Sequence, residues 1–330
     1  MRQILLAATA LTAALTAFGA ARTEAEGPRL GFPLACEIGK TCEIQHYVDR
    51  DPGPGALDYR CGHRTYDKHD GIDFRILDMA AQRAGVEVLA AAAGRVVAVR
   101  DGVADISIRA PGAPSIVGRM CGNRVAINSG DHWLVDYCHL ANGSLKVKVG
   151  DVVAAGQPLA RVGLSGDTEF PHLHMSVRHN DLVVDPFASS TASGCAAGRG
   201  SLWTASAADR MPYKHGAALN WGFATEIVGN AAIEARGVAA PTAAAPAIVA
   251  YARLIGLELG DVIEITLSGP DGKTLATAAL PPLDHDKDQI PAEVGRKRPP
   301  QGWARGVYGG VVTVRRAGAV AITQRWQMTL

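Results

Sequence analysis

Two short segments of the chain carry histidine and aspartate at spacings that suit metal binding. The first runs from His69 to Asp73. Side chains of an extended chain repeat every two residues, so both project to one face, and Gly71 between them keeps that face open. The second segment carries His172 and His174 in the alternating pattern of a half-buried strand, which points both imidazoles the same way. Both segments therefore offer metal ligands.

A third segment adds a further histidine, His139. Its alternation places His139 on the same strand face as Val135 and Tyr137. Three ligands of the His, Asp, His type with an open fourth position describe a catalytic zinc site, because the vacancy holds the water that becomes the nucleophile. Further histidines nearby could move protons near neutrality, since an unperturbed imidazole has a pKa of about 6.5. No His-Glu-x-x-His motif is present, so a histidine must replace that motif's glutamate base.

The other histidines have no comparable partners along the sequence, and we expect surface or packing roles for them. They are His46, His63, His132, His179, His215 and His285. A single His-x-His pair in a strand is more often packed or exposed than functional. The three segments together, in this order, are much harder to produce by chance.

The elements that must position these residues are mostly strands and turns. From Leu30 to about Phe187 the pattern predicts short strands and one short helix, with few long helical periods. The expected strands are Val86–Val99 with an interruption at Gly94, the hairpin Arg124–Asn128 with Trp133–His139, and His172–Val177; the expected helix is Ile76–Ala84.

A second half follows a stretch rich in Ser, Thr, Gly and Ala at 189–200, which is typical of a linker. Beyond it we expect a small antiparallel β-sandwich over residues 201–330, with a strong turn at Ser268–Gly272. Its predicted strands are Ala247–Leu257, Val262–Ser268, Thr274–Ala279, Tyr308–Arg315 and Val320–Met328.

The first half resembles the lysostaphin-like, or β-lytic, zinc metallopeptidases, which cut peptide bonds in bacterial cell-wall peptidoglycan. The resemblance covers roughly Leu30 to Phe187 and rests on the three histidine segments and on the turns Gly150–Gln157 and Val162–Gly166. It implies an all-β chain in which an antiparallel lysostaphin-like metallopeptidase domain, at 22–200, precedes the smaller domain.

The resemblance also implies the roles of the histidines. Carried over residue by residue, the family pattern makes His69, Asp73 and His174 the ligands of one Zn²⁺, and makes His139 and His172 the catalytic pair. One of the pair would take a proton from the water, and the other would stabilise the oxyanion or protonate the leaving amine. Either histidine suits either role.

Two departures from the family pattern adjoin the second motif. Met175 and Ser176 replace the usual Phe-Glu, and the segment from Asp167 to Phe170 replaces a run of small residues. Both bear on the substrate groove and leave the ligands intact.

An alternative function is a noncatalytic one. Some relatives of this family have lost ligands and act as noncatalytic partners of cell-wall enzymes. An iron oxygenase could use the same ligand types, but an oxidising compartment keeps ferrous iron poorly.

The start of the chain predicts export. A basic beginning, an apolar run from Ile4 to Phe18 and small residues after it are typical of a signal peptide over residues 1–21. Later, only Val238–Ala252 approaches the length of a membrane span, and two prolines interrupt it. We expect an exported protein of the periplasm, the extracellular space or the cell envelope. With 33 Lys and Arg against 32 Asp and Glu, no basic excess favours nucleic acid as a partner.

Six cysteines suit an oxidising compartment, and none forms a Cys-x-x-Cys pair. Cys36 and Cys42 flank a short loop that is easily closed. Cys121 and Cys138 flank the hairpin, so they fall nearly opposite each other. Cys61 and Cys195 would then pair by elimination, with free buried thiols as the alternative.

Two charged stretches in the second half are expected to be solvated. The acidic stretch Leu283–Asp288 lacks the glycine and distal glutamate of a calcium loop, so we expect a turn. The basic stretch Arg296–Arg298 is expected to be an exposed connection.

Overall fold

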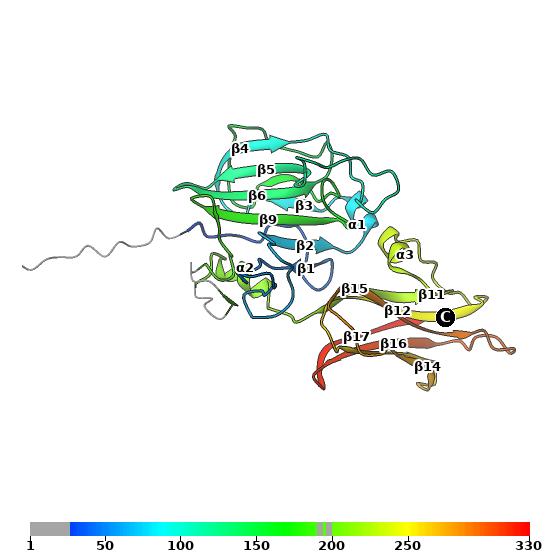
Figure 1. The fold of residues 1–330 in the computed structure, drawn as a ribbon. Coiled ribbons are helices and arrows are strands. Elements are labelled where there is room, and N and C mark those ends of the chain that lie inside the picture. The colour runs from blue at the N-terminus through cyan, green and yellow to red at the C-terminus, as the bar shows by residue number, and fades with distance from the viewer. Residues whose placement is uncertain (1–26, 190–193, 196–199) are drawn as a thin grey trace, which may run out of the picture.

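The computed structural model describes residues 27–189, 194–195 and 200–330. The signal peptide predicted over residues 1–21 lies outside these residues. Within the described ranges, no helix has the length and apolar character needed to cross a bilayer. The two halves of the described chain are built almost entirely of antiparallel strands (Figure 1), as the sequence predicted.

An 8-stranded sheet forms the first half, in the order β1-β2-β9-β6-β5-β4-β7, with β10 paired to β9. Its strands are β1 (Cys42–His46), β2 (Ile72–Ile76), β4 (Gly94–Arg100), β5 (Asn123–Asn128), β6 (Trp133–Leu140), β7 (Val152–Val153), β9 (His172–His179) and β10 (Leu182–Val183). The predicted hairpin and the predicted strand from His172 are thus confirmed.

Strand alternation divides the sheet into an apolar face and a polar face. Ile72 and Phe74 of β2 and Leu173 and Met175 of β9 are fully buried in one hydrophobic cluster. The residues between them in sequence therefore point to the opposite face of the sheet. These include Asp73 and His174, two of the three residues that were singled out as ligands.

Shorter elements complete this half. The helix α1 (Met79–Ala84) begins three residues after the predicted start, because Asp78 caps it by accepting a hydrogen bond from the backbone N–H of Ala81. It ends at Gly85, whose φ of 87° only glycine adopts readily. The stretch predicted as one strand from Val86 is divided between β3 (Glu87–Leu89), which pairs with β8 (Pro158–Arg161), and β4.

The second half contains a 3-stranded sheet, ordered β11-β12-β15, and a 4-stranded sheet, ordered β14-β13-β16-β17. Residues from both sheets share one hydrophobic cluster, in which Leu254, Ile265 and Val312 are fully buried. The elements are α2 (Ala205–Arg210), β11 (Ala217–Ala224), α3 (Asn230–Ala235), β12 (Ala247–Leu257), β13 (Val262–Ser268), β14 (Thr274–Ala279), β15 (Lys287–Lys297), β16 (Val307–Arg316) and β17 (Ala319–Thr329).

Strand β15 was missed by sequence reasoning. The acidic stretch was interpreted as a turn up to Asp288, and Arg296–Arg298 as a connection, whereas β15 runs from Lys287 to Lys297 and so includes the end of the first stretch and most of the second. Its charged residues and Pro291 hide the pattern. The strand nevertheless forms because it lies at the edge of its sheet, where proline, which lacks a backbone N–H, is tolerated.

The hydrophobic cluster of the first half does not end at the predicted linker. Leu202, Trp203, Ala207 and Met211 all belong to it. Trp203 is also within ring contact of Phe74, with a centroid distance of 6.4 Å. Residues 202–211 therefore pack with the first half, although they follow the Ser, Thr, Gly and Ala-rich stretch.

Three disulfides join the six cysteines in the predicted pairs. They are Cys36–Cys42, Cys61–Cys195 and Cys121–Cys138. The hairpin geometry accounts for the third of these, whose Cα atoms lie 4.9 Å apart.

Removing the disulfide between Cys61 and Cys195 is expected to lower the free energy of unfolding by about 2–5 kcal/mol. This bond closes a loop with a sequence separation of 134, so its loss frees the unfolded chain more than loss of Cys36–Cys42, with a separation of 6. Denaturant unfolding of the two Cys→Ser double variants measures both effects. A larger loss for Cys36–Cys42 would contradict the entropic explanation.

Candidate metal and catalytic site

Strand pairing brings three potential ligands together on the polar face. Asp73 of β2 lies directly opposite His174 of β9 in the ladder. His69 precedes β2 and reaches the same point. The ligand atoms are His69 Nε2, Asp73 Oδ1 and His174 Nδ1; Nε2 lies 3.2 Å from each of the other two, which are 3.0 Å apart. The three residues predicted as ligands thus converge.

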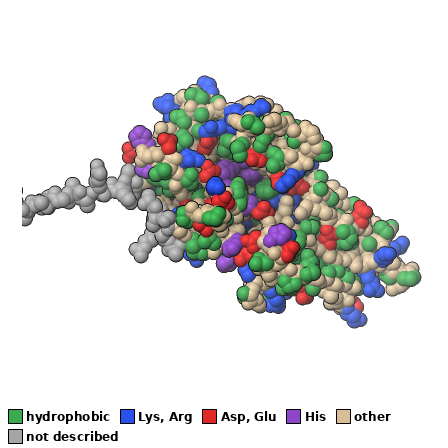
Figure 2. Space-filling model, in the orientation of Figure 1, with side chains coloured by type: hydrophobic (Ala, Val, Ile, Leu, Met, Phe, Trp, Pro, Cys, Tyr) green, Lys and Arg blue, Asp and Glu red, His purple; other side chains and the backbone are tan. Residues whose placement is uncertain are grey.

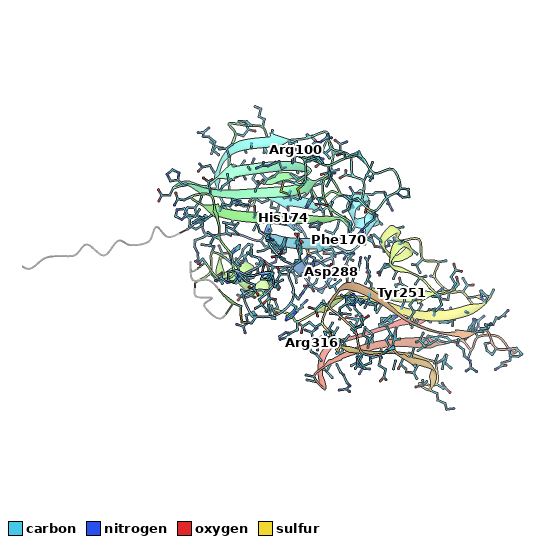
Figure 3. All side chains as sticks on the ribbon, in the orientation of Figure 1. Arg100, Phe170, His174, Tyr251, Asp288 and Arg316 are labelled. Atoms are coloured by element: carbon cyan, nitrogen blue, oxygen red, sulfur yellow. A yellow bond between two sulfur atoms is a disulfide. The ribbon has the colours of Figure 1, made fainter. Side chains whose placement is uncertain are left out.

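This spacing fits a tetrahedral zinc ion. Zn–N and Zn–O bonds of about 2.0–2.1 Å at tetrahedral angles place ligand atoms about 3.3 Å apart. All three residues are buried or nearly so. In Figure 2, histidine side chains gather in a hollow of the face shown, and Figure 3 shows His174 on β9 of the large sheet.

Hydrogen bonds set which ring nitrogen of each histidine faces the centre. His69 Nδ1 donates to the carbonyl oxygen of Tyr47 at 2.6 Å, which leaves Nε2 as the lone-pair nitrogen. His174 Nε2 lies 3.2 Å from Asp70 Oδ1, which leaves Nδ1 toward the centre. Arg178 in turn pairs with Asp70. The donor set is therefore oriented by its own surroundings.

Gly71 is required by the closeness of His174. A Cβ atom at this position would lie 2.6 Å from His174 Cε1 and 2.8 Å from the carbonyl oxygen of Met175. The sequence interpretation, that this glycine keeps the ligand face open, is confirmed.

The side chain of His139 lies on the polar face of the sheet, whereas strand alternation predicted the opposite face. Its expected face was that of Val135 and Tyr137, which are buried in the apolar cluster. The ladder between β5 and β6 instead shifts register between Asn123 and Val125, and His139 has a φ of 58°. This bulge turns the side chain to the polar face, where its ring centroid lies 4.6 Å from that of His172.

Each of the two non-ligand histidines is held through Nδ1. His139 Nδ1 donates to the carbonyl oxygen of Ser165 at 2.7 Å, and His172 Nδ1 donates to that of Phe170 at 3.0 Å. The second nitrogen of each ring is then available to a substrate or water. His172 Nε2 lies 3.4 Å from Asp73 Oδ1, so this nitrogen borders the ligand centre.

Burial and neighbouring charge separate the protonation states in the site. Burial, with the adjacent His172 and His174, holds the pKa of His139 well below its usual value, so this ring is neutral at neutral pH and can accept a proton. Burial alone would raise the pKa of Asp73, but the surrounding histidines hold it well below its usual range. Asp73 is therefore a carboxylate, the form that binds metal.

His46 is a site residue that sequence reasoning missed. It was expected to have a surface or packing role, but it is buried, and its Nδ1 lies 2.9 Å from Asp73 Oδ2. Its own segment carries no motif. The contact arises because His46 of β1 lies opposite Asp73 of β2 across a register shift. Only the strand pairing, which joins residues far apart in sequence, could have revealed it.

Burial alone would lower the pKa of His46, but hydrogen bonds to Asp288 and Asp73 raise it above the usual value.

By contrast, His179 stacks on Trp133 with ring centroids 4.3 Å apart and parallel planes. It lies on β9, one residue out of phase with the face that carries His172 and His174. A packing role, as expected, accounts for it.

The comparisons with known proteins agree with this description of the first half. The model of peptidase family M23 matches residues 67–186. A structure of the catalytic domain of the prophage-encoded M23 protein EnpA from Enterococcus faecalis is 24% identical, covers 49% of this chain and 95% of its own, and has a TM-score of 0.31.

Two further solved structures are similar over comparable stretches. A zinc-containing peptidase from Vibrio cholerae is 24% identical over 45% of this chain, with a TM-score of 0.28, and the match spans 39% of that protein's length. The catalytic domain of lysostaphin from Staphylococcus simulans is 22% identical over 44% of this chain and 88% of its own, with a TM-score of 0.29. The family match contains both histidine motifs and His139, and the chain therefore carries, over residues 67–186, a domain of peptidase family M23, the lysostaphin-like peptidases.

Proposed function

We propose that this protein is an exported zinc metallo-endopeptidase that hydrolyses peptide bonds in bacterial cell-wall peptidoglycan. The observation that carries the proposal is the convergence of His69 Nε2, Asp73 Oδ1 and His174 Nδ1 to within 3.0–3.2 Å of one another. Two further histidines, His139 and His172, border this centre. A peptidase family domain supports the reaction class, and the three disulfides support an oxidising compartment.

Zinc held by His69, Asp73 and His174 would supply Lewis-acid chemistry and lower the pKa of a water. His139, whose Nδ1 donates to the carbonyl oxygen of Ser165, leaves its other ring nitrogen to accept a proton from the attacking water. The water oxygen forms a bond to the peptide carbonyl carbon, and the C–N bond then breaks. His172, held by the Phe170 carbonyl, suits the stabilisation of the oxyanion or delivery of the proton to the leaving amine.

The same proposal covers the chain's organisation. Residues 1–21 would direct export and be removed, residues 22–200 would contain the peptidase domain, and residues 201–330 would form an accessory domain. The hydrophobic cluster of the first half includes Met211, which supports a change between the two parts about ten residues later. The substrate would be a stem peptide or crosslink of peptidoglycan.

Purified protein is expected to contain about one zinc per chain and to release new muropeptides from purified peptidoglycan. Elemental analysis gives the metal content, and mass analysis of the soluble products identifies the bond cut. Protein without zinc, even after zinc is supplied, would refute the metal site. Zinc-loaded protein that binds peptidoglycan without cleaving it would instead favour the noncatalytic alternative.

A further inference from the structure

A chain of three side chains connects the C-terminal half to the metal centre. Asp73 directs Oδ1 toward His69 and His174, and its other oxygen, Oδ2, lies 2.9 Å from His46 Nδ1. The opposite nitrogen, His46 Nε2, lies 3.2 Å from Asp288 Oδ1. Asp288 belongs to β15, the edge strand of the 3-stranded sheet.

His46 is placed to orient Asp73. Only one carboxylate oxygen is directed at the other ligands, so the second needs a partner that prevents rotation about the side-chain bond. His46 provides this partner from inside the protein, since the imidazole is only 8% exposed. Partners of this kind orient metal ligands and typically change metal affinity when they are removed.

Asp288 in turn orients His46. Its backbone carbonyl oxygen accepts a hydrogen bond from Gln45 Nε2 at 2.9 Å, which fixes β15 against β1. Its carboxylate is 72% exposed, and Figure 3 shows it at the border of the C-terminal half that faces the large sheet. The two ring nitrogens of His46 thus each lie within hydrogen-bond distance of a carboxylate oxygen, of Asp73 on one side and of Asp288 on the other. Solvent exposure limits the strength of the contact between Asp288 and His46.

A second set of hydrogen bonds, made by a buried side chain nearby, also holds β15 against the first half. Arg75 is fully buried and donates to Gln45, to Gln289 of β15 at 3.0 Å, and to Glu234 of α3 at 2.7 Å. Its guanidinium lies 3.8 Å from the ring centre of Phe170, whose carbonyl oxygen holds His172. Gln289 and Asp288 are consecutive residues. One segment of the C-terminal half therefore supports the ligand Asp73 through His46. The same segment supports the catalytic His172 through Arg75 and Phe170.

We propose that Asp288 is a positioning residue of the metal centre, acting on Asp73 through His46, so that the C-terminal half completes the peptidase site. The inference rests on the proposed zinc site and goes beyond it, because it assigns a role to the half that the family match leaves out. It also predicts a matched control. Asp286, on the same segment, pairs with His63 Nδ1 at 2.7 Å, and within the described part of the chain this exposed pair contacts none of the three ligands.

The test is the zinc affinity of the full-length protein, measured by competition with a chromophoric chelator. Asp288→Ala is expected to weaken zinc binding about 10-fold, at the lower end of the about 10–100-fold range for such partners, because its contact is partly solvated. Asp286→Ala is expected to leave the affinity unchanged. His46→Gln, which keeps a polar side chain in the buried position, is expected to weaken binding at least as much as Asp288→Ala.

The double variant separates positioning from general loosening of the interface. If Asp288 acts through His46, Asp288→Ala adds nothing in the His46→Gln background. Thermal unfolding of the metal-free variants shows whether each change weakens folding, a readout on which Asp288→Ala and Asp286→Ala should be alike. Equal zinc affinities for these two variants, or full additivity with His46→Gln, would overturn the inference. Failure of the unsubstituted protein to bind zinc would overturn the proposed function, and this inference with it.

Discussion

Replacement of His139 or His172 by alanine is expected to lower turnover on peptidoglycan by about 10²–10⁴-fold while zinc content is retained. Neither ring supplies a ligand atom to the convergent trio, so the metal should remain. Each ring lies beside that trio and is fixed through Nδ1 by a backbone carbonyl, of Ser165 and Phe170 respectively. Such a fixed ring supplies proton transfer or oxyanion stabilisation only in the transition state, so its loss lowers kcat.

The two losses should not multiply. The ring centroids of His139 and His172 are 4.6 Å apart, and residues that act as a unit give a double variant little worse than the poorer single one. His179→Ala is the control, because His179 stacks on Trp133 at the far end of the same strand. If His179→Ala costs as much turnover as His172→Ala while both retain fold and zinc, the assignment of the catalytic face is wrong.

Much of the site could be predicted because its parts are local in sequence. His172 and His174 are two residues apart on one strand, and His69 and Asp73 are separated by a glycine that the close approach of His174 requires. Alternation with buried Leu173 then sets the polar face. The hairpin similarly determines that Cys121 meets Cys138.

The rest depends on contacts that local patterns do not encode. The bulge that turns His139 away from the core is a deviation from alternation, with a φ of 58° in the left-handed region that few non-glycine residues adopt. Strain of this kind persists where the surrounding structure imposes it, as the hydrogen bond from His139 N–H to the Cys121 carbonyl does here. His46 likewise becomes a site residue only through the pairing of β1 with β2.

The relation between the two halves was also beyond sequence reasoning. Arg75 has the alternating position of a polar-face residue, and nothing nearby in sequence indicates that it is fully buried. Its ion-pair partner Glu234 and the amide oxygen of Gln289, which accepts a hydrogen bond from it, come from the C-terminal half. Burial of a guanidinium is costly unless such partners are present. The second half therefore stabilises a residue of the strand next to the catalytic one, where Arg75 lies opposite His172 in the ladder.

Asp73→Ala is expected to abolish stoichiometric zinc binding, with an effect larger than the about 10–100-fold loss that follows removal of a ligand's hydrogen-bond partner. Asp73 is the only carboxylate of the convergent trio in the described part of the chain. Its charge also balances the surrounding imidazoles, which hold its pKa well below the usual range. Without it, only His69 and His174 remain, too few ligands for a three-ligand catalytic site. Elemental analysis after dialysis measures the occupancy.

Asp67→Ala is the matched control for this change. Asp67 is six residues upstream of Asp73, and its carboxylate is 41% exposed and pairs with the exposed Lys68. Removing it subtracts the same charge without touching the trio, so zinc content and turnover should match those of the unsubstituted protein. Circular dichroism shows whether Asp73→Ala remains folded, as the three disulfides and the intact apolar cluster lead us to expect. A folded Asp73→Ala protein that retains one zinc would show that the ion lies elsewhere, and the assignment of His69 and His174 would fail with it.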